Sequence, residues 1–135
     1  EKIRFLFSLS EFKSNDLMNE TLKLSLSEKI KNQDAPYLIA TAIRNYRHTN
    51  TAWNFVEKNW EKINKIFPNN TIPRMFSGIK SVSDEELAER ISLFFDKNPV
   101  PQGQKTIDQN LKKMKINLKF VDHQSKILNN WLQDF

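Results

Sequence analysis

Apolar residues recur every three or four positions along most of the chain, which is the spacing of one face of an α-helix. The clearest seam consists of Trp53, Val56, Trp60, Ile63 and Phe67, whose steps are 3, 4, 3 and 4 residues. This seam predicts one long helix that holds both indole side chains in the protein core. The alternation of apolar and polar residues that marks a half-buried β-strand is not sustained anywhere.

The same periodicity predicts seven or eight helices joined by short loops. We expect them over residues 2–11, 16–27, 37–47, 53–67, 71–81, 83–95 and 105–122, with a short last helix over 126–132 after a break near residues 123–125. Pro36 suits a first helical turn, and Ser83 with Glu86 has the S-x-x-E pattern of a capping box. We therefore expect an all-α fold of antiparallel helix pairs, either closed into a bundle or stacked as an α-solenoid.

The chain has 135 residues, of which 39% are hydrophobic, so we expect one helical domain over residues 1–135. Because it begins with Glu1 inside a helical pattern, we expect it to be a segment of a longer protein. Its start lacks the pattern of a signal peptide, and no apolar run approaches the length of a membrane span. We therefore expect no membrane span and a cytoplasmic location.

Composition excludes several kinds of chemistry. The chain has no cysteine, which rules out disulfides, thiolate metal sites and a thiol nucleophile. Its two glycines, Gly78 and Gly103, cannot build a glycine-rich phosphate loop. His48 and His123 lie far apart without an H-E-x-x-H motif, and we interpret both as surface residues. We predict neither catalytic residues nor a metal site in this segment.

A formal net charge of +5 raises the question of nucleic-acid binding. The last predicted helices carry many lysines: Lys105, Lys112, Lys113, Lys115, Lys119 and Lys126. However, lysines at this spacing are also what the solvated face of an amphipathic helix carries, and arginines, which read base edges, are few. We therefore expect no nucleic-acid partner.

Two arginines are the candidate binding residues. Arg44 and Arg74 each follow apolar residues at the end of a helix or in a short helix, so either side chain could point into a cavity. The alternative is that each is solvated or forms a salt bridge with a neighbouring carboxylate. By contrast, Asp84, Glu85 and Glu86 are explained by the favourable position of acidic residues at a helix N-terminus.

Four segments together resemble the C-terminal helical domain of the M1 (gluzincin) zinc aminopeptidases. The most specific part is residues 30–60, which contain a Q-D pair, a helix and then A-W-x-F-x-x-x-N-W. The other three follow in the order and at the intervals of the family: FPNNTIPRMFSGI, SDEELAERISLFFDKNPVP and TIDQNLKKMKINLKFVDHQSKILNNWL. The resemblance covers nearly the whole chain and is best from Ser27 onward.

This resemblance implies a layer of HEAT-like helix pairs that closes over a catalytic domain and helps to select and position peptide substrates. The implied partners are the catalytic and other domains of the same parent chain and peptide substrates. The family's zinc ligands and its amine-recognising motif lie in earlier domains, so zinc is implied for the parent enzyme and not for this segment.

The resemblance also assigns a role to one candidate arginine. In the antigen-trimming members, an arginine at the end of the helix after the Q-D element lines the internal cavity, and Arg44 stands at the matching interval. A guanidinium there could hold the C-terminal carboxylate of a peptide, with Arg74 as the alternate. Two other functions stay open: a free-standing HEAT-like scaffold for another protein, and a basic nucleic-acid binder.

Overall fold

The computed structural model describes residues 2–135, with side chains from Arg4 onward, and within that range the chain is helical without strands. The all-α prediction is confirmed. The elements are α1 (Lys2–Ser8), the 3-10 turn η1 (Leu9–Glu11), α2 (Asn15–Ser25), α3 (Ala35–Arg44), α4 (Thr49–Ile66), α5 (Ile72–Met75), η2 (Phe76–Ser81), α6 (Glu85–Lys97), η3 (Pro101–Gly103) and α7 (Gln104–Gln133).

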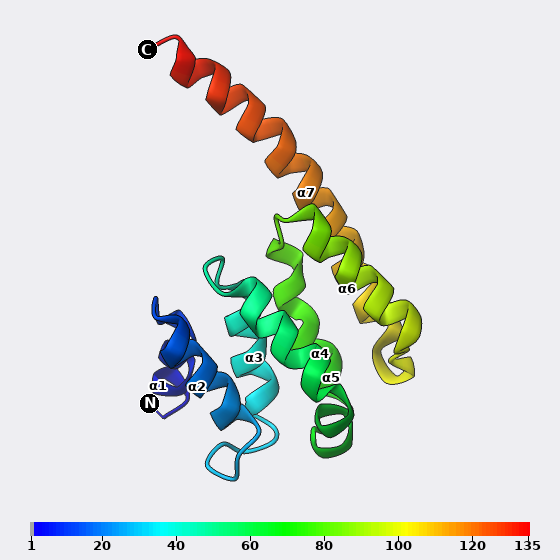
Figure 1. Ribbon diagram of the computed structural model, residues 1–135. Helices are drawn as coiled ribbons and strands as arrows, with labels where there is room; N and C mark the ends of the chain where they lie inside the picture. The colour runs from blue at the N-terminus through cyan, green and yellow to red at the C-terminus, as the bar shows by residue number, and fades with distance from the viewer. Residues whose placement is uncertain (1) are drawn as a thin grey trace.

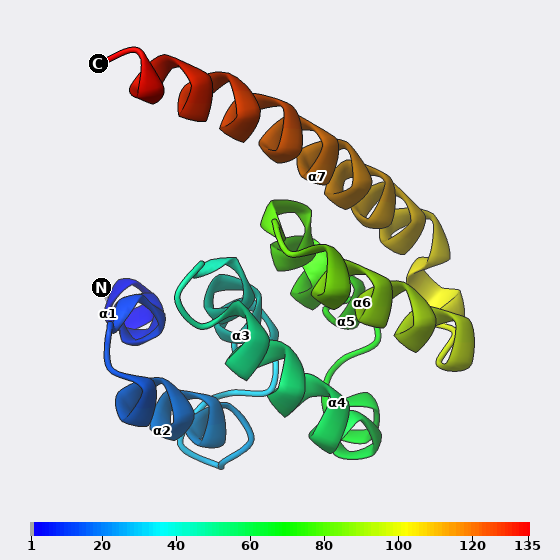
Figure 2. The same ribbon diagram turned by 45° about the horizontal axis from the view of Figure 1, so that its top comes forward.

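The helices lie side by side in the order of the chain (Figure 1). Helices α1, α3, α5 and α7 form one row together with η2. In this row α3 contacts α1, α5 and η2, and α7 contacts α5 and η2. The even-numbered helices α2 and α4 also contact each other, and both pack on α3, while α6 packs on α7. Figure 2 shows α1 and α3 on one side, with α2 and α4 on the other. Stacking as a HEAT-like solenoid stays a prediction.

Helix α3 is the centre of the core. Its residues Ala35, Leu38, Ile39, Ala42 and Ile43 are completely buried, because elements contact this short helix on several sides. Small side chains let its neighbours approach closely. A Cβ on Gly78 of η2 would collide with the backbone carbonyl of Ala40 and lie 2.9 Å from the Cβ of Ile43.

Five aromatic rings join α4, η2 and α6. Trp53 has no exposed surface and packs edge-on against Phe94, with 5.2 Å between ring centroids. Trp60 makes a similar contact with Phe94 at 5.3 Å but is only half-buried. The predicted seam is therefore confirmed at Trp53, whereas the prediction that Trp60 is a core residue is wrong. One side of Trp60 faces a groove instead.

Two predicted details of the helix ends and loops are wrong. Asp84, not Ser83, caps α6, since its Oδ1 accepts a hydrogen bond of 2.7 Å from the backbone N–H of Leu87. His48 is buried and not a surface residue, and its Nε2 lies 3.1 Å from the carbonyl oxygen of Lys13. Asn45 anchors the same loop by donating to the carbonyl of Ser10 at 2.9 Å.

The predicted break near residues 123–125 is also wrong, because α7 continues through it to Gln133. Polar residues cost a helix little where they face solvent, and Asp122 pairs with Lys126 one turn later at 2.7 Å. The distal half of α7 extends beyond the rest of the molecule (Figure 1). Within the described residues, no helix combines the length and apolar character needed to cross a membrane.

Candidate peptide-binding surface

Arg44 is the last residue of α3, and its side chain is exposed. The two ion pairs found among the described residues join Arg90 to Glu57 and Lys126 to Asp122, so neither involves Arg44. Of the predicted alternatives, a salt bridge of Arg44 therefore has no counterpart in this part of the chain, whereas a solvated Arg44 agrees with its exposure. The guanidinium of Arg44 is available to an anion from outside.

Arg74 reaches α3 from a different element. It lies in α5, is exposed, and its Nη1 donates a hydrogen bond of 2.8 Å to the hydroxyl of Tyr37 in the first turns of α3. This neutral partner fixes the position of the guanidinium without cancelling its charge. The remaining N–H groups of Arg74 can still bind a carboxylate.

The two arginines belong to one surface strip, which we call the α3 strip: Tyr37, Thr41, Arg44 and Arg74. The three α3 residues are spaced four and three positions apart, so they share one side of the helix. Seven residues of helix correspond to a rise of about 10 Å between Tyr37 and Arg44. A peptide lying along this strip could meet a guanidinium near each end.

The loop after α3 adds two residues that the sequence analysis did not select. Tyr46 is 78% exposed, and the Arg47 guanidinium carbon lies 4.9 Å from the centre of its ring. The signal in the sequence N-Y-R-H is that Arg47 directly follows Tyr46, because an arginine beside an aromatic residue can stack on its ring. Arg47 thus places a second guanidinium close to Arg44 in the chain.

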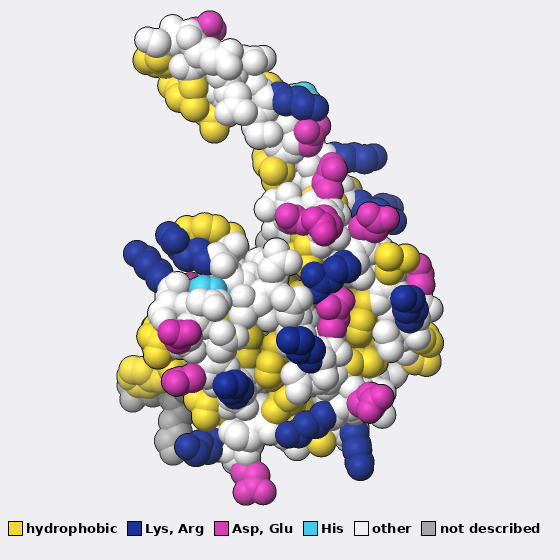
Figure 3. Space-filling view, in the orientation of Figure 1, with side chains coloured by type: hydrophobic (Ala, Val, Ile, Leu, Met, Phe, Trp, Pro, Cys, Tyr) yellow, Lys and Arg dark blue, Asp and Glu magenta, His cyan; other side chains and the backbone are white. Residues whose placement is uncertain are grey.

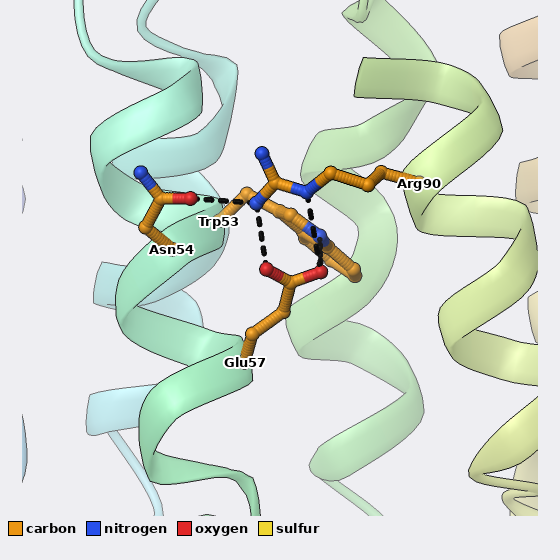
Figure 4. Close-up of polar contacts among 4 residues, drawn as sticks. All are labelled: Trp53, Asn54, Glu57 and Arg90. Carbon is orange, nitrogen blue, oxygen red and sulfur yellow. Dashed lines mark hydrogen bonds and ion pairs between the residues drawn. The ribbon is translucent and has the colours of Figure 1, made fainter. Parts of the chain in front are cut away.

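A groove of about 600 Å³ lies between α4 and α6, and it was not predicted either. Trp60, Leu93 and Phe94 supply its apolar surface, and Arg90 with Glu57 closes part of its wall. Figure 4 shows how this wall is fixed: Arg90 donates to Glu57 and to Asn54, and Glu57 also accepts the indole N–H of Trp53 at 2.9 Å. The contacts of Arg90 connect residues more than 30 positions apart, which local spacing cannot reveal.

The described residues do not fit a zinc ion. No group of three His, Asp or Glu side chains comes together among them. His48 is buried against the Lys13 carbonyl, whereas His123 is exposed on α7. The positive charges are also dispersed, and on the face shown in Figure 3 basic and acidic side chains are intermingled.

The sequence of this chain matches a known domain family and several aminopeptidases. The family model described as ERAP1-like C-terminal domain matches residues 1–116. Endoplasmic reticulum aminopeptidase 2 of Bos taurus is 30% identical over 137 residues, which cover 98% of this chain and 14% of that protein. Aminopeptidase M1-C of Oryza sativa subsp. japonica is 29% identical over 124 residues, covering 90% of this chain and 14% of that protein.

Glutamyl aminopeptidase of Bos taurus gives the same picture, with 29% identity over 99% of this chain and 14% of that protein. The chain thus spans about one seventh of the length of the curated relatives it matches. Since the family model covers well over half of the chain, the chain belongs to the ERAP1-like C-terminal domain family, and corresponds to the C-terminal part of M1 aminopeptidases.

Proposed function

We propose that this chain is part of the non-catalytic C-terminal domain of an M1-type zinc aminopeptidase, where it closes over the active site and helps to position peptide substrates. The observation that carries the proposal is the alignment of almost the whole chain with about one seventh of the aminopeptidases it matches. Zinc and the groups that cleave the peptide bond would then belong to other parts of the parent chain. A cytoplasmic location stays part of this proposal.

The α3 strip supports the positioning role. A guanidinium binds a carboxylate through two parallel hydrogen bonds, and Arg44 has no internal anion among the described residues that would compete. Contacts remote from the scissile bond accelerate a reaction when they hold the substrate in the reactive position. In this proposal Arg44 anchors the C-terminal carboxylate of the peptide, and Arg74, held by Tyr37, is the alternate anchor.

The test uses the full-length enzyme and two kinds of substrate. Replacing Arg44 with alanine should weaken transition-state binding of peptides several residues long by about 1–3 kcal/mol, the scale for a hydrogen bond to a charged group. A single-residue anilide substrate should be almost unaffected, because it is too short to reach the anchor. Lys65→Ala, which removes an exposed positive charge from α4, is the matched control.

A C-terminally amidated peptide provides an independent readout. If Arg44 holds a carboxylate, the wild-type enzyme should cleave the amidated peptide with the same reduced efficiency that the Arg44→Ala variant shows on the peptide with a free C-terminal carboxylate. Equal losses on peptide and anilide together with a lower melting temperature would refute the anchor and indicate a structural role. The parent reading frame separates this proposal from a free-standing scaffold, because only the enzyme requires an H-E-x-x-H motif upstream.

A further inference from the structure

The end of the chain from Ile116 to Phe135, most of it in α7, carries the largest set of exposed apolar side chains described in the chain. Ile116 and Phe120 form a first group, and Ile127, Leu128, Trp131, Leu132 and Phe135 form a second, each of them between 51% and 89% exposed. Figure 3 shows hydrophobic side chains along one edge of this projecting segment. We call these seven side chains the α7 face.

The α7 face is large enough to be an interface. With about 150–250 Å² for a whole aromatic side chain, and the low end of that range for Ile and Leu, the exposed parts of the seven residues amount to roughly 700 Å². That is about what each partner buries in a standard protein–protein interface, and it exceeds the ~300–600 Å² of the largest apolar patch on a typical monomer.

The order of residues along the helix is self-complementary for four of the seven apolar residues, whereas Ile127, Leu128 and Leu132 mirror polar positions. The two apolar groups are separated by the polar residues 122–126. Ile116 and Phe135 lie equally far from the point between Ser125 and Lys126, and so do Phe120 and Trp131. In an antiparallel pair centred there, the first group of each copy meets the Trp131–Phe135 pair of the other, whose rings already pack edge-on at 4.4 Å.

Charge favours the same orientation. The first half of α7, residues 104–119, has five lysines against one aspartate, whereas residues 120–135 have one lysine against two aspartates. A parallel pair would bring the two lysine-rich halves together, along with the two globular parts. An antiparallel pair centred between residues 125 and 126 overlaps only over residues 116–135, so it keeps the lysine-rich residues 104–115 of the two copies apart and places each globular part beyond the other's tip.

We propose that two copies of this chain associate through the α7 face, with their α7 helices antiparallel. The expected result is that the 135-residue chain sediments as a dimer at tens of micromolar. Replacing Ile127 and Leu128 together with aspartate should raise the dimer dissociation constant at least tenfold. Leu93→Asp, which alters a comparably exposed leucine on α6, should leave the dimer intact.

Because the chain has no cysteine, single introduced cysteines can report the orientation. Gln124→Cys lies close to the proposed two-fold axis and should form an intermolecular disulfide on mild oxidation. Asp134→Cys should not, since the two copies of that residue would be about 25 Å apart along the helix axis. Far-ultraviolet circular dichroism should show that each variant remains helical.

Three outcomes would overturn the proposal. The first is a monomer throughout this concentration range, which would assign the α7 face to another part of the parent protein. The second is a dimer that is unaffected by the double aspartate variant. The third is equally efficient crosslinking at positions 124 and 134, which would indicate a parallel pair. None of these results depends on whether the parent enzyme is an aminopeptidase, so this inference is tested separately.

Discussion

Arg90 of α6 donates from Nη2 to Glu57 of α4 over a distance of 2.6 Å, which ties these two helices together at the outer surface. Their side chains are 40% and 30% exposed, so water weakens the electrostatic attraction between them. Glu57 has a second role, because its Oε1 accepts the indole N–H of the fully buried Trp53. The carboxylate therefore serves the core as well as the surface.

This double role predicts unequal effects of the two partners. Arg90→Ala should lower the free energy of unfolding by about 0–1 kcal/mol, as exposed ion pairs do. Glu57→Ala should cost about 1–3 kcal/mol, because it also leaves the Trp53 N–H without an acceptor. Glu57→Gln keeps an acceptor and should cost less than Glu57→Ala. Urea unfolding measures all three, and equal losses for both alanine variants would contradict the role in the core.

The two tryptophans of the α4 seam should differ in the same measurement. Trp53→Ala should reduce the free energy of unfolding by about 3–5 kcal/mol, since it empties a buried aromatic site. Trp60→Ala should cost less, about 1–2 kcal/mol, because Trp60 is only half-buried and removes less area from water. Losses of the same size for both variants would show that Trp60 is as well packed as Trp53.

Local patterns predicted most of the fold because helix formation is itself local. The α4 seam, the position of Pro36 in the first turn of α3 and the prolines between α6 and α7 all follow from neighbours in the sequence. The break in α7 was predicted wrongly for the same reason. The polar residues around His123 interrupt the apolar periodicity, which predicted the end of a helix. However, a helix that projects into solvent can continue without an apolar face at that point.

Contacts between distant residues could not be predicted in this way. His48 looked like a surface residue because its sequence neighbours are polar, yet it is buried and contacts Lys13, 35 residues earlier. Glu57 and Arg90 are 33 residues apart, and their spacing carries no signal. Likewise, the sequence placed Arg44 at a helix end, whereas the hydrogen bond between Arg74 and Tyr37 required the packing of α5 on α3.

Gly78 of η2 should not tolerate even a methyl side chain. Gly78→Ala would force its new methyl group against Ala40 and Ile43 at the contact between η2 and α3, and both of those neighbours are buried in the core. We expect a loss of about 1–3 kcal/mol, the usual cost of overpacking. Thermal unfolding compares this variant with Ser77→Ala, where the neighbouring site is only partly buried. A melting temperature unchanged in Gly78→Ala would show that α3 and η2 can separate at little cost.

The last prediction concerns the chemistry of the chain on its own. We expect the purified 135-residue chain to bind less than stoichiometric zinc and to leave an aminoacyl anilide uncleaved. A zinc site needs at least three protein ligands, and no such group of His, Asp or Glu forms among the described residues. Elemental analysis after dialysis and an anilide assay at high protein concentration measure the two properties. One zinc per chain, together with turnover that persists through repeated purification and is lost with chelator, would show that this segment carries an active site of its own. It would also contradict the proposal that this domain positions the peptide and another part of the parent enzyme cleaves it.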